Sequence, residues 1–442
     1  MSSFRAFAEG MTDVLVLGAG LTGLSCAMLL ARDGHQVTVL DRDLACPTPG
    51  KEWEEWDRPG VTQFRLAHIM LPRWHAVMSL ELPSVLDRVA AAGGQPFNFA
   101  GSLPPVPSDD RFQTITARRP ILEAALAAEA AETPGVTLRR GVAVTGLVTQ
   151  GDRVAGVRLG DGDKILAELV VDCGGRRSAL SSWLFEAGLP APAEERADAG
   201  FVYYMRHYRG DRPEPRGPLL QHHDSLSILT LPGDTDTWSV GFVTSVRDKP
   251  LRALRNPAAW EAALARYPLA AHWAEGTPLT GVEAMGGLVD QWRTVTTPGV
   301  VAVGDAACCT NPSLGRGATM GLLHARLLRD VLRAGLPTSF ADHTATEIGP
   351  WYEATVWFDR HRIAEIDADA TGTPYEPNDP QWTGARAMYA AACTGNAEAL
   401  RAQLAIACML PDAPDLQVPD TGIRYPLPGA TRTELLSTLA AA

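Results

Sequence analysis

Residues 13–41 read DVLVLGAGLTGLSCAMLLARDGHQVTVLD and contain the clearest fold signal in this chain. The stretch begins with an unbroken apolar run at residues 14–17, as expected of a strand that is buried on both faces of a parallel sheet. Apolar residues then recur at every third or fourth position over residues 21–31, which predicts a helix that packs one face on that sheet and ends near Gly34. Residues 37–40 predict a second strand, so the stretch is expected to form a strand, a glycine turn, a helix and a strand.

The turn has the GxGxxG spacing, and each of its glycines has a distinct physical role. Gly18 permits a tight turn, Gly20 lets the backbone approach a pyrophosphate, and Gly23 allows close packing of helix on strand. The free N–H groups and the positive dipole end of the helix start stabilise the phosphates, and Asp41 can accept a hydrogen bond from a ribose hydroxyl. The predicted dinucleotide-binding residues of this region are Gly18, Gly20, Leu21, Thr22, Gly23, Asp41 and Arg42.

The composition of the whole chain is that of a large, acidic, globular protein. Its 442 residues are 46% hydrophobic and 20% charged, which is enough for one or two domains with sizeable cores. A net charge of −12 provides no overall basic field to attract phosphate backbones or anionic lipids. We therefore expect no nucleic-acid partner and no membrane insertion.

Three further features indicate a cytoplasmic protein. Residues 1–10 are too short and too polar to supply the apolar core of a secretory signal, and no run of about eighteen apolar residues follows. The seven cysteines are an odd number without a CxxC pair, which favours a reducing compartment over a disulfide framework. The oligomeric state stays open.

A second strand, loop and helix pattern lies far downstream. Residues 300–303 form another apolar run, which is followed by Gly304-Asp305 and by the segment NPSLGRGA at residues 311–318. Apolar residues at helical spacing over residues 320–331 predict a long helix after this loop.

With this downstream segment, the chain resembles the para-hydroxybenzoate-hydroxylase-like flavoproteins, the class A monooxygenases with their epoxidase and prenyl-reductase relatives. Their second fingerprint, a GD segment followed by a proline and a GxG turn, is similar to residues 304–317. The resemblance implies FAD as the cofactor, with Asp305 on its ribityl chain. It also implies that the loop lies along the isoalloxazine through Pro312, Gly315, Arg316, Gly317 and Ala318.

Two more segments resemble the same family and lie in its order. The segment LVVDCGGRRS, residues 169–178, is similar to the family's middle DG motif and contains Asp172. Arg119, just before Pro120 at a predicted helix start, matches an arginine that reaches toward FAD, and Val144 matches a residue that holds adenine by its backbone.

The resemblance implies an α/β fold: a Rossmann-like, glutathione-reductase-type FAD-binding domain with an inserted mixed β-sheet substrate domain and C-terminal helices. We assign residues 11–80, 108–182 and 284–335 to the FAD-binding domain, residues 81–107 and 183–283 to the substrate domain, and residues 336–442 to a helical region.

Aromatic and β-branched residues predict three strands of the substrate domain, at residues 201–208, 226–231 and 238–244. Tyr203, Met205 and His207 alternate with their neighbours, so one set faces the flavin, but the sequence does not say which. Residues 351–366 and 385–409 predict helices that brace the two domains or form an interface, before a proline-rich tail.

The candidate catalytic residues are His68 and Arg65, in a segment expected near the flavin. An imidazole titrates near pH 6.5, which suits a general base. Cys308, beside Cys309, stands where the family commonly has a histidine; packing is the simpler interpretation of the two cysteines, with a covalent flavin or a redox pair left open. No histidine or cysteine cluster has metal-ligand spacing, so we predict no metal.

The resemblance favours a monooxygenase, a hydroxylase or an epoxidase, that uses NAD(P)H and O₂ on an apolar, aromatic or polyketide-like small molecule of secondary metabolism. No second GxGxxG unit is present, which fits a transient hydride donor or reduction by a partner protein. The alternatives are a prenyl-reductase-type dehydrogenase, a halogenase, for which the chain lacks a WxWxIP segment, and a non-catalytic FAD-binding protein.

Overall fold

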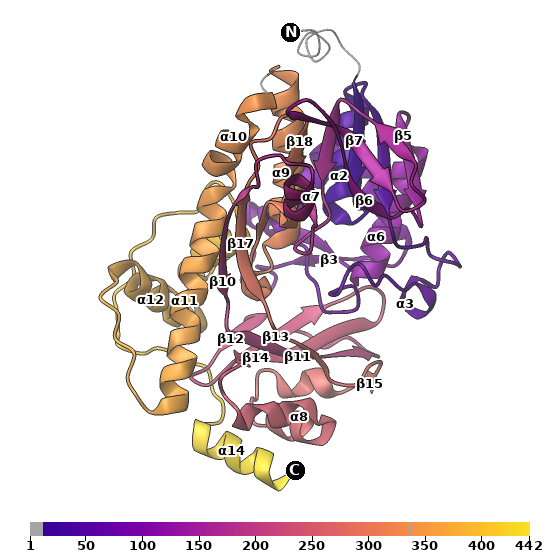
Figure 1. Cartoon of the computed structure of the whole chain (residues 1–442). Coiled ribbons are helices and arrows are strands. Elements are labelled where there is room, and N and C mark those ends of the chain that lie inside the picture. The colour runs from indigo at the N-terminus through magenta and orange to yellow at the C-terminus, as the bar shows by residue number, and fades with distance from the viewer. Residues whose placement is uncertain (1–11, 336) are drawn as a thin grey trace.

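The computed structural model describes residues 12–335 and 337–442, and residues 1–10, for which we predicted no secretory signal, lie outside the described part. Figure 1 shows the parallel sheet and its helices at one end of the molecule and an antiparallel sheet at the other. The C-terminal helices run along one side of both. Among the described residues, no helix is both long enough and apolar enough to cross a bilayer.

A five-stranded parallel sheet forms the centre of the FAD-binding part, as predicted. Its strands run in the order β18-β9-β1-β2-β5, and every pairing is parallel. Because side chains alternate along a strand, Val14 and Val16 of β1 enter the core on one face, while Leu15 and Leu17 enter the core on the other. The strands are β1 Asp13–Leu17, β2 Gln36–Asp41, β5 Val136–Arg140, β9 Leu169–Asp172 and β18 Val300–Ala302.

Helices cover one face of this sheet, and a small antiparallel sheet covers the other. The helices of the first face are α2 Leu21–Arg32, α6 Arg119–Glu132 and α9 Gly317–Arg333. The second face carries β6 Val144–Gln150, β7 Arg153–Leu159 and β8 Lys164–Leu166, with α7 Leu180–Glu186 beside them.

The segment after β2 packs mainly with the parallel sheet. It contains α3 Glu52–Glu55, α4 Pro72–Glu81 and α5 Pro83–Ala91, and then β3 Gln95–Asn98, which pairs with β4 Gln113–Thr116 after η1 Pro107–Phe112. Val85 and Val89 of α5 lie in the same core as β1, although we placed residues 81–107 in the substrate domain. The apolar face of α5 fits against α6, which explains this position.

The inserted sheet is antiparallel in all of its described pairings, whereas we predicted a mixed sheet. The three predicted strands are confirmed as β11 Phe201–Arg209, β13 Ser227–Pro232 and β14 Thr237–Ser245. Short connections join β12 to β13 and β13 to β14, which favours antiparallel pairing of these strands, because a parallel pair needs a long crossover. The sheet is completed by β12 Leu220–His222, β15 Thr277–Pro278 and β16 Glu283–Met285.

The two faces of the inserted sheet have different neighbours. Val202 and Tyr204 pack in a core with η2 Pro250–Arg255, α8 Pro257–Leu264, η3 Ala271–Ala274 and α14 Arg432–Ala441. Tyr203 and Met205 face the other way, toward a large cavity. A three-stranded sheet of β10 Ala193–Asp198, β17 Val289–Thr294 and β19 Cys308–Cys309 joins this region to the FAD-binding part.

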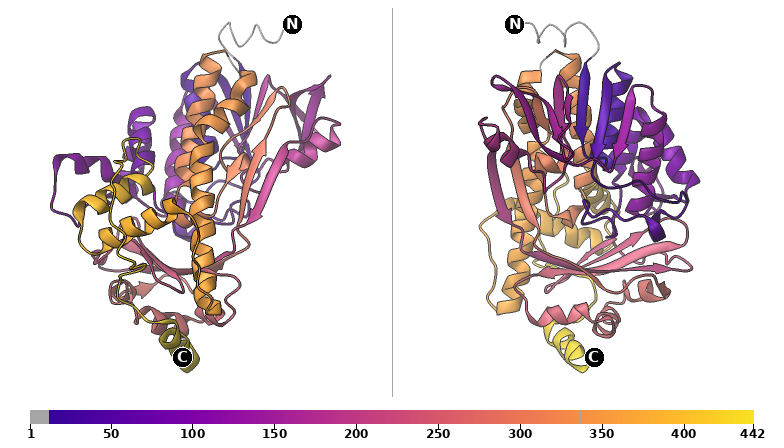
Figure 2. Two further views of the ribbon diagram at one scale, coloured as in Figure 1. Left: turned by 90° about the vertical axis from the view of Figure 1, so that its left-hand side faces the viewer. Right: turned by 45° about the vertical axis from the view of Figure 1, so that its right-hand side comes forward.

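The C-terminal helices are α10 Phe340–Glu347, after η6 Pro337–Ser339, then α11 Gly349–Thr371, α12 Pro380–Cys393 and α13 Ala397–Ala407. Figure 2 shows α11 running from the parallel-sheet end of the molecule to the antiparallel sheet. The single predicted helix at residues 385–409 is wrong, because Gly395 has a φ of +97° and Asn396 caps a new helix. Helix α14 lies within the expected proline-rich tail, where no helix was predicted.

Candidate functional site

One cavity of about 1670 Å³ extends from the glycine turn of β1 to the inserted sheet and the C-terminal helices. A pocket for one small ligand usually measures about 300–1,000 Å³, so this space is large enough for a dinucleotide and a second molecule. Every residue that the sequence predicted for cofactor binding lines it.

The glycine turn has the geometry that the sequence predicted. Gly18 has a φ of +103°, and a Cβ there would lie 2.6 Å from the carbonyl oxygen of Cys173. A Cβ at Gly23 would lie 1.9 Å from the Gly18 carbonyl oxygen, whereas a Cβ at Gly20 would meet nothing within 4 Å. Gly18 and Gly23 are therefore required by packing, while the surface at Gly20 is left open for a ligand to approach.

The carboxylate of Asp41 is held at the end of β2 by several donors. It accepts hydrogen bonds from the Ala19 and Asp43 backbone N–H groups at 2.6 and 2.8 Å, and from the Arg58 guanidinium at 2.5 Å. A carboxylate has about four acceptor positions, so one remains for a ribose hydroxyl. Arg58 was missed by the sequence analysis, because no motif marks it and its partners are distant in the chain.

A buried charge network connects the two ends of the cofactor site. Glu123 of α6 has no exposed surface and accepts hydrogen bonds from both Arg58 and Arg119. Arg119 also donates from Nη1 to His68 Nε2 at 3.0 Å. Burial raises the pKa of Asp305, and the charge of Arg119 partly opposes this increase. The network therefore runs from Asp41 at the first fingerprint to the surroundings of Asp305 at the second.

His68 lies on the cavity wall, but both of its ring nitrogens are engaged. Nδ1 lies 2.9 Å from the Leu66 carbonyl oxygen, which can only accept, so Nδ1 carries the proton and Nε2 accepts from Arg119. Burial and the Arg119 charge lower the pKa of His68 to about 3. This arrangement favours a role in positioning Arg119 over the predicted proton transfer.

The predicted catalytic role of Arg65 is not supported, because its guanidinium does not line the cavity. Nη2 donates to the Trp56 carbonyl at 2.8 Å, and the group lies 5.0 Å from the centre of the Trp53 ring. A planar cation stacks well on an indole, which explains why this side chain turns away.

The two fingerprints meet at Thr22. A Cβ at Gly304, where φ is +64°, or at Gly321 would lie 2.9 or 2.2 Å from the Thr22 side chain. The Gly304 N–H donates to Nδ1 of His324, a buried residue of α9 that the sequence analysis missed. These contacts fix η4 Gly304–Ala306 and place the Asp305 side chain at the cavity.

Asp172 of the middle motif holds its own loop. Its two carboxylate oxygens accept hydrogen bonds from the Gly174 N–H, at 2.9 Å, and from the Ser178 hydroxyl. Burial raises the pKa of Asp172. The residue lies at the end of β9 next to the glycine turn of β1, so it shapes the wall of the cofactor site from the neighbouring strand.

The loop of the second fingerprint is anchored on α11. η5 Pro312–Leu314 ends at Gly315, which has a φ of +65°, and α9 then begins at the cavity. The Arg316 guanidinium points away from the glycine turn: it donates to the Thr355 hydroxyl and to the Ile406 carbonyl, both at 3.1 Å. We predicted that Arg316 lies along the flavin. The residue lines the cavity as part of this loop, and its side chain fixes the loop to Thr355 and Ile406.

Asn311 and Asp359 form a second anchor of this loop. The Asn311 amide donates to Asp359 at 3.2 Å and accepts from the Tyr203 hydroxyl at 3.1 Å. Burial raises the pKa of Asp359 to about 8, so its carboxyl group holds a proton at neutral pH.

Cys308 and Cys309 are buried, and both are free thiols, like the other five cysteines. Burial raises the pKa of each thiol, which leaves them in the unreactive protonated form. This agrees with a packing role.

These observations fit FAD. The α2 start with open space at Gly20 suits a pyrophosphate, the free acceptor position of Asp41 suits a ribose hydroxyl, and the half-buried Asp305 carboxylate faces the cavity beside the loop. The positive end of α9 lies behind that loop and would stabilise negative charge on a ring placed against it.

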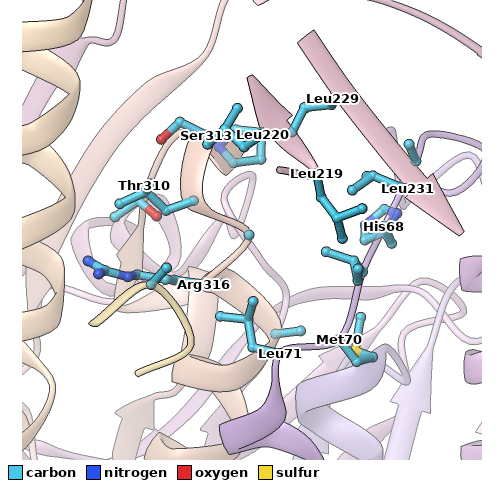
Figure 3. Close-up of a pocket in the computed structure, with 18 of the residues that line it drawn as sticks. His68, Met70, Leu71, Leu219, Leu220, Leu229, Leu231, Thr310, Ser313 and Arg316 are labelled. Carbon is cyan, nitrogen blue, oxygen red and sulfur yellow. The ribbon is translucent and has the colours of Figure 1, made fainter. Parts of the chain in front are cut away.

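Beyond the loop, the cavity has an apolar wall. Figure 3 shows Leu219, Leu229 and Leu231 on the opposite side of the space from Thr310 and Arg316. The C-terminal helices supply another part of the wall, through Phe358, Trp382, Met388, Tyr389 and Leu404. We expected these helices to brace the two domains or to form an interface. Their contribution to the cavity was missed, because their apolar residues look the same in sequence as ordinary core residues.

Comparisons with known proteins agree with this geometry. A family model described as FAD dependent oxidoreductase matches residues 13–81, and one described as Tryptophan halogenase matches residues 121–199. Protein Rv3254 of Mycobacterium tuberculosis is 28% identical over 72% of this chain and 73% of its own length. The menaquinone reductase of Mycolicibacterium smegmatis is 26% identical over 77% of this chain and 81% of its own length.

Among solved structures, PqsL of Pseudomonas aeruginosa, a probable FAD-dependent monooxygenase, superposes with a TM-score of 0.60. It is 18% identical, and the match covers 82% of this chain and 99% of PqsL. The chain is an FAD-dependent oxidoreductase with the fold of the class A flavoprotein monooxygenases and halogenases.

Proposed function

We propose that this oxidoreductase is a monooxygenase, a hydroxylase or an epoxidase, that acts on an apolar small molecule with NAD(P)H and O₂. The observation that carries the proposal is the continuity of the cavity. The loop at residues 311–318, here called the flavin loop, and the apolar wall at Leu219, Leu229 and Leu231 face the same space. The fold shared with PqsL supports it.

FAD bound at the two fingerprints would supply the electron transfer from NAD(P)H and the activation of O₂. The residues of this chain would then position the substrate and exclude water. The leucines of β13 and the aromatic residues of α12 provide a low-dielectric wall, and the start of α9 stabilises negative charge at the loop. Such a site needs no catalytic triad.

The test is oxygen incorporation by the purified, FAD-loaded enzyme. Candidate aromatic and polyketide-like compounds are screened for faster NAD(P)H oxidation, and the best one is turned over under ¹⁸O₂. We expect a product 18 mass units heavier for each oxygen gained from labelled gas, or 16 with unlabelled gas. Turnover that proceeds at the same rate without oxygen, and gives an unlabelled product, contradicts the proposal.

The second candidate is a reductase of the prenyl-reductase type. The similarity to a menaquinone reductase over most of both chains favours it, and the apolar wall would also accept a prenyl chain. A gain of two mass units under anaerobic conditions identifies this activity. A product whose mass gain depends on added chloride or bromide would identify a halogenase instead. This activity is tested because residues 121–199 match the tryptophan halogenase model.

A further inference from the structure

Two buried acids lie behind the flavin loop, on either side of Asn311. The Asn311 backbone N–H donates to Oδ1 of Asp290 in β17 at 2.8 Å, and its side-chain amide donates to Oδ2 of Asp359 in α11 at 3.2 Å. Asp290 is 4% exposed and Asp359 is 2% exposed. The residue that begins the loop is therefore held between two carboxyl groups that are both shielded from solvent.

No basic side chain in the described part of the chain forms an ion pair with either acid. The charge of Arg316 acts on Asp359, but its guanidinium donates to the Thr355 hydroxyl and to a carbonyl of α13. Arg362, three residues beyond Asp359, donates to the Leu226 carbonyl at 2.7 Å. The cations of this region are thus directed away from the two carboxyl groups.

The other titratable and polar groups around the two acids are neutral. Tyr203 of β11 donates from its hydroxyl to Oδ1 of Asn311 at 3.1 Å. Burial, together with nearby acids, raises the pKa of Tyr203 and that of Tyr352 above the usual range. The hydroxyl of Ser313 is close enough to Asp359 to oppose the rise of its pKa. None of these groups supplies a positive charge.

Two negative charges beside one buried amide are costly, so this pair of acids favours keeping a proton. Burial, with the charge of Asp290, raises the pKa of Asp359 to about 8 against the opposing effects of its loop neighbours. Burial also raises the pKa of Asp290, which the Asn311 N–H opposes. Asp359 is therefore a buried acid that is close to titration in the physiological range.

This acid lies on the side of the flavin loop that faces away from the leucine wall. Pro312, Ser313 and Gly315 of the loop line the cavity. In Figure 3 the Ser313 oxygen and the Arg316 guanidinium point away from Leu231, and Arg316 reaches Thr355 of α11 on that side. A charge on Asp359 would act on a ring bound against the loop through protein, where screening is weaker than in water.

We propose that Asp359 takes up a proton when the bound FAD is reduced and releases it when the FAD is reoxidised. Hydride transfer from NAD(P)H moves two electrons and one proton to the ring and leaves NAD(P)⁺, so the ring gains one negative charge. This charge favours the neutral form of the carboxyl group behind the loop, and the proton that Asp359 binds comes from solvent. The inference goes beyond the proposed function, because it needs FAD at the loop and no particular substrate.

The test is the reduction potential of the FAD-loaded enzyme, measured against reference dyes from pH 6.5 to pH 9. As the pH rises through about 8, the potential of the wild type should fall below that of Asp359→Asn, because only the wild type then has a carboxylate behind the ring. Between the two ends of this range the difference should grow by at least tenfold in the equilibrium constant of reduction, which is about 30 mV for two electrons.

Glu353→Gln is the matched control, because it removes the same charge from an exposed position of the same helix. Its potential should keep the pH dependence of the wild type. Asp290→Asn, which removes the second acid, should shift the steeper part of that dependence to lower pH. A difference between the wild type and Asp359→Asn that stays constant from pH 6.5 to pH 9 would indicate a structural role and overturns the inference.

If Asp359→Asn does not retain FAD, the wild type decides by its proton uptake. The protein is reduced electrochemically in weak buffer with a pH-indicator dye, and the uptake per FAD should be larger at pH 8.5 than at pH 7. An uptake that is constant or falls over this interval overturns the inference. No substrate takes part in these measurements, so the ¹⁸O₂ experiment can fail while this inference stands, and the reverse.

Discussion

At the scale of single residues, the glycines of the turn between β1 and α2 differ in what a methyl group would meet. At Gly23 the added carbon would overlap the Gly18 carbonyl oxygen, which is backbone and cannot move aside. At Gly20 it would point into open space at the cavity. One position therefore serves folding, and the other serves the ligand.

A pair of substitutions separates these two roles. Gly23→Ala should lower the free energy of unfolding of the apoprotein by about 2 kcal/mol or more, because the overlap forces α2 away from β1. Gly20→Ala should leave that stability nearly unchanged and weaken FAD binding by about tenfold or more. Urea unfolding of apoprotein and FAD titration by fluorescence measure the two effects. Equal losses of stability in both variants would contradict the assignment.

His68 offers a second residue-scale prediction. Since its pKa is lowered to about 3 by burial and by Arg119, it does not change charge between pH 5 and 8. His68→Gln should therefore reduce the rate of NAD(P)H-driven flavin bleaching without changing the shape of its pH profile. A wild-type profile with an acidic limb near pH 6.5 that vanishes in His68→Gln would instead establish the general base.

At the scale of elements, α6 joins the two halves of the cofactor site. Its first turn carries Arg119, and one turn later Glu123 binds both Arg119 and Arg58. The i,i+4 spacing brings the two α6 side chains to the same helix face. Because Arg58 also binds Asp41, the position of α6 determines the geometry at the end of β2.

Glu123→Ala should lower the free energy of unfolding by about 3–5 kcal/mol, because it removes the buried carboxylate that binds Arg119 and leaves Arg58 with only Asp41 and Asp43. Glu132→Ala, on the same helix, removes an acid that is 69% exposed and should cost about 0–1 kcal/mol. Urea unfolding of both variants gives the comparison. Similar losses for Glu123 and Glu132 would show that the buried network contributes little.

At the scale of the whole molecule, several histidines are folded in their neutral form. Burial lowers the pKa of His68, His223 and His324 to about 3, and that of His207 to about 4. In the unfolded chain each titrates near pH 6.5, so the unfolded state binds more protons as the pH falls below that value. Stability is lost progressively in this range.

Two buried acids act in the opposite direction. Burial raises the pKa of Asp359 to about 8 and that of Glu283 to about 7. The folded state keeps these protons at a pH where the unfolded state has lost them, so their contribution to stability falls as the pH rises toward 7 and 8.

The sum of these effects predicts a stability maximum near pH 6.5. Below pH 6.5 the stability lost through the four histidines exceeds the stability gained through the two acids. Above pH 6.5 the stability lost through the two acids dominates. The urea midpoint of the FAD-loaded protein should be lower at pH 5.5 and at pH 8 than at pH 6.5. A midpoint that rises steadily up to pH 8 would contradict the prediction.

The parallel sheet and its fingerprints could be predicted because their signals are local. Residues 13–41 form the predicted strand, turn, helix and strand, since each apolar run and each helical repeat involves residues within about twenty positions, although Gly18 also packs against the distant Cys173 carbonyl. The break between α12 and α13 was missed, because Gly395 inside an apolar pattern has the same appearance whether it continues a helix or ends it.

Local patterns predicted a Rossmann-like sheet with Asp41, Asp172 and Asp305 near its strand ends, and the family resemblance of these segments implied FAD. Contacts between distant segments were needed to show that Tyr203 and Met205 face the cavity, that the Arg316 side chain supports its loop, and that Arg362 reaches the far end of the site. Sequence patterns report interactions between residues that are close in the chain. The alternation of side chains along a strand separates its two faces but does not show which element packs on each face. Arg362 meets the Leu226 carbonyl across more than one hundred residues of chain, and no local pattern records that contact.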